Sequence, residues 1–230
     1  MFKGVFFDID DTLYDSTKLS TMARKNAIQA MVDAGLPVEN EKVAYGLLER
    51  IITKYGSNYS KHYDRLLEEL KLEWNPKIVA SGVVAYERTK VGYLRPYPKV
   101  IPTLFSLKGV YQLGVISNGL AVKQWEKLIG LGLHHVFEIV ATSEDVGYEK
   151  PHVEIFENAM DRAGLEPKEC VMVGDRLDTD IAGAKMVGMF AVRVIQGKFS
   201  DDEPSSEEDT PDAVITDISE LRSVLGGKGE

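Results

Sequence analysis

The amino-acid sequence predicts an α/β protein in which a doubly wound parallel sheet is interrupted by an inserted four-helix domain. Two different patterns of apolar residues along the chain support this fold class. From about residue 96 onward, short apolar runs alternate with helical stretches, and a similar apolar run occupies residues 4–9. Residues 16–95 show only helical periodicity. We therefore expect one α/β core, residues 1–15 and 96–230, with residues 16–95 inserted after its first strand.

The helices of the insertion follow from apolar side chains that recur every three or four residues. The first helix stops at Gly35-Leu36-Pro37, which combines a helix-ending glycine with a proline that cannot continue the helix. Short connections between helices are typical of a bundle. The four apolar stripes lie in residues 19–34, 43–55 and 59–70 and in the segment that follows Pro76.

The core alternates between strand and helix, which is the pattern of a Rossmann-like sheet with helices on both faces. After the first strand, further strands are predicted at residues 111–116, 136–140, 170–173, 190–195 and 213–216. Helices are predicted at residues 121–131, 152–163 and 179–187, and a last helix ends the chain. Because the sheet is parallel, the carboxyl ends of its strands meet at one edge, where such folds bind ligands.

Composition and charge exclude several classes of protein. The 230 residues carry a formal net charge of −9, from 27 basic and 36 acidic side chains, which argues against binding to a nucleic acid polymer. No apolar stretch reaches the length of a membrane span, and the N-terminus lacks the pattern of a signal peptide. Cys170 is the only cysteine, so the simpler interpretation is a buried inert thiol in a reducing compartment. We expect a soluble cytoplasmic protein.

Polar side chains follow four of the predicted strands. The first strand ends in Asp8, Asp10 and Asp11, and burying that much negative charge is costly unless a cation neutralises it. Fold stability gives no reason for this cluster, so a chemical role is the better explanation. The later strands are followed by Ser117-Asn118-Gly119, by Lys150-Pro151, and by Gly174-Asp175 with Asp178 and Asp180.

This inventory suits the chemistry of a phosphoryl group. Carboxylate oxygens are hard ligands for Mg²⁺, which binds through a few carboxylates together with a substrate phosphate. A lysine and a hydroxyl group supply charge balance and orientation for an anionic phosphoryl group. One aspartate can attack phosphorus, and a carboxyl group two residues on can protonate the leaving oxygen and then deprotonate a water. Hydrolysis of phosphate monoesters needs acceleration of up to ~10²¹-fold, which favours such cooperation.

Four segments in this order resemble the motifs of the haloacid dehalogenase-like hydrolase superfamily. They are Asp8-x-Asp10-x-Thr12-Leu13, Ser117-Asn118-Gly119, Lys150-Pro151 and Gly174-Asp175-x-x-x-x-Asp180. Each motif alone is a weak signal, but four in order, each after a strand, are specific. The helical block, residues 16–95, resembles the small α-helical cap that this superfamily inserts after the first strand. The resemblance covers essentially the whole chain and implies a cap that closes over the core and contacts the leaving group.

The resemblance implies a role for each matched residue. Asp8 is the expected nucleophile and a Mg²⁺ ligand, and Asp10 is the expected general acid/base, with its backbone carbonyl on the metal. Asp175 is expected to bind Mg²⁺ directly, whereas Asp180 acts through a water or by orienting Lys150. Lys150 is expected to neutralise both the nucleophile and the transferring group.

Substrate binding falls, by the same resemblance, to four residues. Ser117 is expected to hydrogen-bond a phosphoryl oxygen, helped by neighbouring backbone amides. Asp10 also separates reactions within the superfamily, because dehalogenases lack a carboxylate at this position and a halide leaves without a proton. Its presence therefore implies phosphoryl transfer. The expected substrate-binding residues are Thr12, Ser117, Asn118 and Lys150.

Simpler explanations exist for each segment taken alone. The interpretation of the segment that begins at Asp8 as a calcium-binding loop fails. Such a loop needs glycine at its sixth position and glutamate at its twelfth, where this chain has Leu13 and Leu19. A helix N-cap stays open for one of the first carboxylates, and neither Asp11 nor Asp178 is given a chemical step. Taken alone, Lys150-Pro151 would be a surface lysine before a helix. Ser117-Asn118-Gly119 alone would be a turn.

The sequence therefore predicts a Mg²⁺-dependent phosphatase that hydrolyses a small phosphorylated metabolite through an aspartyl-phosphate intermediate. One alternative is a phosphomutase of the same superfamily, and another is a binding or regulatory protein with low turnover on this fold. The acid/base at Asp10 argues against the latter, because a pure binder does not need it. The substrate stays open among phosphoglycolate, sugar phosphates, acylneuraminate phosphates and nucleotides, on which relatives with this type of cap act. A monomer or a homodimer is expected.

Overall fold

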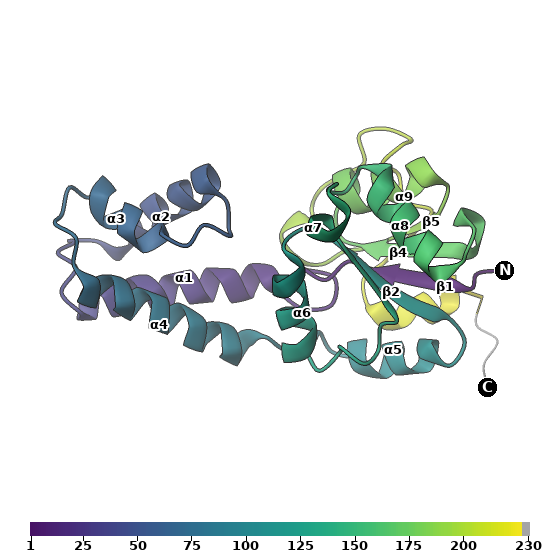
Figure 1. Ribbon diagram of the computed structural model, residues 1–230, viewed down its shortest axis with the longest axis horizontal. Helices are drawn as coiled ribbons and strands as arrows, with labels where there is room; N and C mark the ends of the chain where they lie inside the picture. The colour runs from purple at the N-terminus through teal and green to yellow at the C-terminus, as the bar shows by residue number, and fades with distance from the viewer. Residues whose placement is uncertain (227–230) are drawn as a thin grey trace. The chain divides into compact units, whose positions relative to one another are not determined.

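A sheet of six parallel strands forms the centre of the α/β part of the chain (Figure 1). The computed structural model describes residues 1–226, and residues 227–230, with which the predicted core ends, lie outside the described part. The order across the sheet is β3-β2-β1-β4-β5-β6, which confirms the predicted parallel α/β class. The strands are β1 (Gly4–Phe7), β2 (Gln112–Ser117), β3 (Ile139–Thr142), β4 (Cys170–Gly174), β5 (Phe190–Val194) and β6 (Ala213–Ile215).

Strand β1 lies between β2 and β4, and the order of the chain reverses there. Phe7 pairs with Val115 on one side and with Val173 on the other, so the three strands stay in register up to the residue before Asp8. The residues immediately after β1, β2 and β4 therefore emerge at the same edge of the sheet. In open parallel sheets, this switch point is the place where ligands bind.

Helices lie on both faces of the sheet (Figure 1). On the face under α8 and α9, Phe6 of β1 packs with Met172 and Phe156 in one buried apolar cluster. Each fully buried phenylalanine contributes roughly 2–3 kcal/mol of hydrophobic stabilisation. No helix among residues 1–226 is both long and apolar enough to cross a membrane. The helices of this part are α5 (Val100–Lys108), α6 (Ala121–Gly130), α7 (Ser143–Val146), α8 (Val153–Ala163), α9 (Ala182–Val187) and α10 (Leu221–Val224), and short helical turns span Pro167–Glu169, Leu177–Ile181, Gly197–Phe199 and Ile218–Glu220.

Residues Lys18–Tyr93 form a second compact unit, and the first unit holds Met1–Thr17 with the chain from Leu94 onward. The helical unit has an apolar core of its own, to which Met31, Leu48 and Leu66 contribute fully buried side chains. This core is what four amphipathic helices with short connections need to stay together. The helices are α1 (Ser16–Asp33), α2 (Glu41–Tyr55), α3 (His62–Glu69) and α4 (Pro76–Tyr93).

Several elements of the core differ from their predictions: β3 is shifted, and α5 and α7 were not predicted. The strand expected at residues 136–140 lies at Ile139–Thr142, because Val136 and Phe137 are buried without pairing while Thr142 pairs with β2. Burial, which the apolar run does indicate, is not the same as strand pairing. Helix α5 was not predicted, since Pro102 and the β-branched residues beside it disfavour a helix interior but are tolerated in a first turn.

Cys170 lies buried in β4. Burial raises the pKa of its thiol to about 12, so the reactive thiolate does not form at neutral pH. The thiol is therefore an apolar core group without a chemical role, in agreement with its sequence context.

Candidate active site

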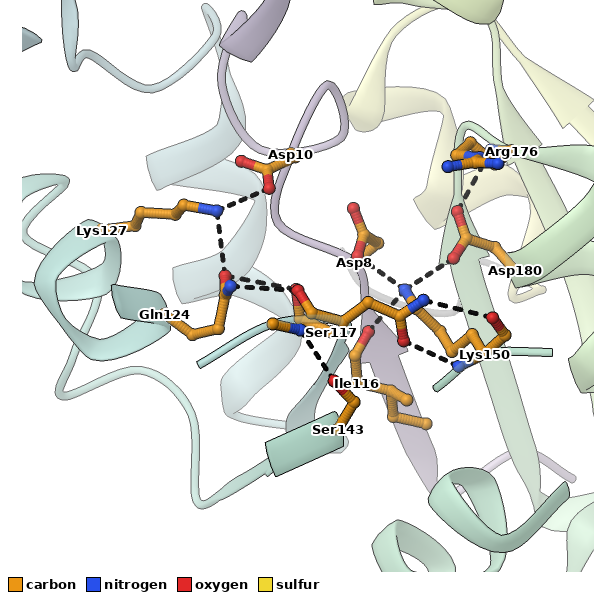
Figure 2. A network of polar contacts seen from close by, with 12 residues as sticks. Asp8, Asp10, Ile116, Ser117, Gln124, Lys127, Ser143, Lys150, Arg176 and Asp180 are labelled. Carbon is orange, nitrogen blue, oxygen red and sulfur yellow. Dashed lines mark hydrogen bonds and ion pairs between the residues drawn. The ribbon is translucent and has the colours of Figure 1, made fainter. Parts of the chain in front are cut away.

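Asp8 is the first residue after β1, and the sheet itself fixes its position. Its backbone N–H donates to the carbonyl oxygen of Val173 in β4 at 2.9 Å, which continues the ladder by one residue. Asp8 is 8% exposed, and its side chain points toward the residues after β4 (Figure 2). An ionised carboxylate in so buried a place needs a partner.

Lys150 is that partner, and its ammonium group lies at the centre of the site (Figure 2). Its Nζ atom donates to Asp8 Oδ1 at 2.6 Å, to Asp180 Oδ1 at 2.6 Å and to the carbonyl oxygen of Ile116 at 2.8 Å. These three acceptors match the three donors of an ammonium group. Burial alone lowers the pKa of Lys150, but the carboxylates of Asp180 and Asp8 more than offset it, so the lysine stays charged.

Asn118 holds the backbone of Lys150 in place. Its side-chain amide donates to the Lys150 carbonyl oxygen at 3.2 Å, and its Oδ1 accepts from the Lys150 N–H at 2.7 Å. These two hydrogen bonds connect the loop after β2 to the segment before α8. The side chain that the resemblance assigns to substrate binding is thus engaged with the lysine, and contact between Asn118 and substrate stays a prediction.

Three buried carboxylates form a set that fits a metal ion. Asp8, Asp175 and Asp180 each offer an oxygen, and these oxygens lie within 4.8 Å of one another. Burial first, and then the charges of Asp180 and Asp8, raise the pKa of Asp175 to about 9. Without a cation, Asp175 therefore keeps its proton at neutral pH, because the single charge of Lys150 does not balance three carboxylates. Hard oxygen ligands with an unmet need for positive charge are the donor set of Mg²⁺, so the residues present fit this ion.

The same charges and burial also shift the pKa of Asp8, the predicted nucleophile. Burial raises the pKa of Asp8 to about 6, with repulsion from Asp180 and Asp10 added to it, and the charge of Lys150 opposes the shift. The charge of Lys150 thus favours the ionised carboxylate of Asp8, which is the form that the predicted nucleophile requires.

Gly174 makes room for Asp180 at the end of β4. The Asp180 carboxylate accepts from the backbone N–H of Arg176 at 3.1 Å and is held across the turn after the strand. A Cβ atom on residue 174 would come within 2.3 Å of Asp180 Oδ2, a contact too close to exist. Only glycine permits this approach, so the position of Asp180 depends on it.

Substitution Gly174→Ala is expected to lower kcat by about 10- to 100-fold, because Asp180 must shift and Lys150 then loses an acceptor. The overpacked site is also expected to lose about 1–3 kcal/mol of folding free energy. Steady-state kinetics and thermal unfolding measure both effects. Gly46→Ala is the matched control, since a Cβ atom there meets nothing within 4 Å, and wild-type activity is expected. Equal activity of the two variants would contradict the assignment.

Asp10 lies on the other side of Asp8 from the lysine–aspartate cluster and is held by two donors (Figure 2). Its Oδ1 accepts from the Tyr14 hydroxyl at 2.5 Å, and its Oδ2 accepts from Lys127 Nζ at 2.5 Å. Burial, and then the Asp10 carboxylate, raise the pKa of the Tyr14 phenol far above its ordinary value, so it stays a donor. The two predicted carboxylates thus occupy separate environments two residues apart.

Ser117 ends β2 beside a buried amide. Its hydroxyl donates to Gln124 Oε1 at 3.3 Å, and Gln124 Nε2 donates to the carbonyl oxygen of Asn118 at 3.0 Å. Gly119, which has a φ of 125°, donates its N–H to Ser143 Oγ at 2.8 Å. The turn after β2 is therefore held in shape by side chains from α6 and α7.

Two of the remaining motif residues, Asp11 and Asp178, have structural partners. Asp11 accepts from both the N–H and the hydroxyl of Thr17 in the first turn of α1, at 2.9 and 2.6 Å. Asp11 thus binds a backbone N–H of the first turn of α1, although it is not the N-cap residue, since α1 begins at Ser16. Asp178 forms an exposed pair with Arg176. The Thr12 hydroxyl is buried and has no hydrogen-bond partner in the described part of the chain, so a contact of Thr12 with substrate stays a prediction.

Sequence reasoning missed Tyr14, Gln124 and Lys127. One signal for Gln124 was present, because it shares a helix face with the apolar Leu128 and Leu131, and a lone amide on a buried face usually has a partner. Lys127 carried no such signal, since either of the two lysines on α6 is by pattern alone a solvated side chain. Its contact with Asp10 joins positions 117 residues apart in the sequence.

Comparisons with known proteins assign this chain to a family. A family model described as haloacid dehalogenase-like hydrolase matches residues 2–188. The chain belongs to this family of hydrolases, as the four motifs predicted.

The most informative relatives are phosphatases. The chain is 50% identical over 227 residues to the glyceraldehyde 3-phosphate phosphatase of Methanopyrus kandleri, covering 98% of this chain and 97% of that protein. The phosphatase of the same name from Methanocaldococcus jannaschii is 45% identical over 226 residues, with 98% and 97% covered. A crystal structure of a HAD phosphatase from Thermococcus onnurineus is similar with a TM-score of 0.70 and 30% identity, over 99% of each chain. The chain is thus a phosphoric monoester hydrolase of this family.

Proposed function

We propose that this enzyme is a Mg²⁺-dependent phosphatase that works through an aspartyl-phosphate on Asp8. One observation carries the proposal: the buried ammonium group of Lys150 bridges Asp8 and Asp180 beside Asp175. A carboxylate that is kept ionised, buried and next to a set of cation ligands is equipped to attack an anionic phosphoryl group.

In the first step, a carboxylate oxygen of Asp8 forms a bond to phosphorus, and the bond between phosphorus and the ester oxygen breaks. The leaving oxygen takes a proton from the carboxyl group of Asp10 and departs as an alcohol. Lys150 balances the charge of Asp8 before the attack and that of the phosphoryl group during it. Ser117 and the N–H groups of the turn after β2 orient the phosphoryl oxygens.

In the second step, water attacks the phosphorus of the aspartyl-phosphate and gives a proton to the carboxylate of Asp10. The bond between phosphorus and the Asp8 oxygen breaks, inorganic phosphate leaves, and both carboxyl groups return to their initial states. General acid/base catalysis of this kind contributes typically ~10²–10⁴-fold. Each catalytic residue thus acts twice, which agrees with the separate environments of Asp8 and Asp10.

Mg²⁺ would be held by Asp8 and Asp175, with the backbone carbonyl of Asp10 as a further ligand and Asp180 acting through a water. When bound, the ion supplies Lewis-acid stabilisation of the phosphoryl charge. The excess of three carboxylates over the single charge of Lys150 supports this assignment.

Glyceraldehyde 3-phosphate is the substrate we propose, because relatives of that name match this chain at 50% and 45% identity over nearly its whole length. The residues of the mechanism all belong to the first unit. A role of the helical insertion, residues 16–95, as a substrate-selecting cap stays a prediction from the family resemblance. The cytoplasmic location and the monomeric or homodimeric state stay predictions from sequence.

The test is a comparison of phosphorylated metabolites with the purified enzyme. We expect the highest kcat/KM for glyceraldehyde 3-phosphate among a set that includes phosphoglycolate, phosphoserine and a hexose monophosphate, with free phosphate as the product. A higher kcat/KM for another member would replace the proposed substrate. An isomerised ester from the hexose phosphate, without free phosphate, would favour a phosphomutase.

Removal of divalent cations is expected to abolish activity and lower the thermal stability of the protein. Excess EDTA leaves the buried carboxylates without a counter-ion, so kcat is expected to fall by at least about 10³-fold, given that metal and charge stabilisation supply several kcal/mol. Mg²⁺ added back is expected to restore the rate and raise Tm, whereas Na⁺ at equal ionic strength is not. Full activity in EDTA would contradict the metal requirement.

A further inference from the structure

Lys127 forms an ion pair with Asp10 (Figure 2). Its Nζ atom lies 2.5 Å from Asp10 Oδ2 and 3.0 Å from Gln124 Oε1. The Lys127 side chain is 18% exposed, whereas that of Asp10 is 41% exposed. The lysine thus reaches from α6 to the turn after β1 and is largely removed from solvent.

Gln124 determines where that ammonium group sits. The residue is 3% exposed, its Oε1 accepts from Ser117 and from Lys127, and its Nε2 donates to the Asn118 carbonyl oxygen. With these bonds, the amide has one orientation that satisfies its partners. A continuous chain of hydrogen bonds therefore runs from Asp10 through Lys127 and Gln124 to Ser117.

Another lysine on the same helix shows what an ordinary surface pair looks like. Lys123 contacts Glu126 three residues on, and their side chains are 49% and 45% exposed. Such a local exposed pair is worth ~0–1 kcal/mol and fixes little. The contact of Lys127 differs because it joins two elements far apart in sequence and meets a carboxylate that the mechanism uses.

A carboxylate that is 41% exposed on a turn can rotate unless both oxygens are held. Tyr14 holds one oxygen of Asp10, and Lys127 holds the other. Loss of the lysine frees one oxygen and leaves the carboxyl group several rotamers. Because proton transfer requires a defined geometry, a displacement of about 1 Å can cost ~10²-fold in rate.

We propose that Lys127 is a positioning residue that holds the carboxyl group of Asp10 in register with the phosphoryl-binding turn at Ser117, through Gln124. The inference rests on the proposed function, since it requires Asp10 to be the acid/base. Lys127 acts through Asp10 and takes no proton itself. Its role is to keep the acid/base and the phosphoryl site at a constant separation.

The experiment varies the leaving group in Lys127→Met and Lys127→Gln, which both remove the ammonium donor and keep a long side chain. Phenyl phosphate needs a proton on its leaving oxygen, whereas 2,4-dinitrophenyl phosphate does not. The value of kcat/KM reports the first step, transfer to Asp8. We expect kcat/KM to fall about 10- to 100-fold for phenyl phosphate and less than about 3-fold for the dinitrophenyl ester. A change confined to folding would lower both alike.

A second comparison uses Asp10→Asn as the background. If Lys127 acts through Asp10, Lys127→Met is expected to cause no further loss of kcat/KM there. Lys123→Met, the matched control on α6, is expected to behave as wild type with both esters. Equal losses with the two esters, no loss with either, or a full additional loss in the Asp10→Asn background would each overturn the inference.

Asp8→Asn separates this inference from the proposed function. If wild type hydrolyses both esters and Asp8→Asn hydrolyses neither, the proposed function stands and the Lys127 variants test only positioning. If Asp8→Asn stays active, the proposed function itself fails, whatever the Lys127 variants do.

Discussion

Substitution Asp8→Asn is expected to lower kcat by at least about 10⁴-fold with no loss of folding stability. The amide has the shape of the carboxylate but cannot form the aspartyl-phosphate, and it removes one of the crowded buried charges. Phosphate release from an aryl ester measures the rate, and thermal unfolding measures the stability. Activity within about 10-fold of wild type would rule out Asp8 as the nucleophile.

The companion variant Asp10→Asn is expected to fail at a different point. It retains the nucleophile, so an ester with a good leaving group still transfers its phosphoryl group to Asp8. The aspartyl-phosphate then accumulates, because no carboxylate deprotonates the attacking water. Acid quench with radiolabelled substrate is expected to trap labelled protein with Asp10→Asn and none with Asp8→Asn. Label on Asp8→Asn would place the covalent bond on another residue.

Substitution Asp175→Asn is expected to have opposite effects on activity and on stability. Loss of the carboxylate is expected to lower kcat by about 10³-fold, because the predicted cation loses a direct ligand. In metal-free buffer at pH 7, the same change is expected to raise the free energy of unfolding by about 3 kcal/mol, since wild type must take up a proton on Asp175 when it folds and the amide of the variant needs none. Chemical unfolding in EDTA and steady-state kinetics measure the two effects.

The stability gain of Asp175→Asn is expected to depend on pH. The pKa of Asp175 is about 9 in the folded protein, above its ordinary value of 3.8, because burial and the neighbouring carboxylates disfavour the charge. A group with a raised pKa in the folded state costs nothing at pH values below its unfolded pKa and costs most above its folded pKa. Metal-free wild type is therefore expected to lose stability relative to the variant as pH rises from about 4 to about 9.

The control for these effects is Asp178→Asn. Asp178 is exposed, pairs with Arg176 and lies three residues from Asp175 in the same turn. We expect wild-type activity and no pH-dependent gain in stability. Saturating Mg²⁺ is expected to reverse the order of stability, because only wild type gains binding free energy from the ion. If Asp178→Asn and Asp175→Asn gave the same curves, the pairing of Asp175 with a cation would be contradicted.

Much of the fold was open to prediction because its signals are local. The run Gly4–Phe7 is buried on both sides by neighbouring strands, and its apolar composition indicates that. The four stripes of the helical unit correspond to α1 through α4. The error at β3 has a physical cause, since Val136 and Phe137 are as apolar as a strand but lie outside the ladder.

The sequence also allowed us to predict which residues make up the proposed site. Each motif comes after a strand, and parallel strands bring the residues at their carboxyl ends to one edge of the sheet. The contacts that each of these side chains makes were less predictable. Asp11 accepts from Thr17 in the first turn of α1, Asn118 holds the backbone of Lys150, and Asp180 needs Gly174 beside it. These contacts depend on the order of strands and on the rotation of helices, which no short segment specifies.

The sequence by itself determined the α/β class, the helical insertion, the four polar clusters and the family, because strand and helix periodicities and strand-end motifs are short-range patterns. The tertiary structure alone decided which donors meet the two carboxylates after β1. Asp8 meets Lys150 across 142 positions and Asp10 meets Lys127 across 117. Such pairs form because β1 lies at the centre of the sheet, where the packing of distant segments, and not local preference, brings charges within hydrogen-bonding distance.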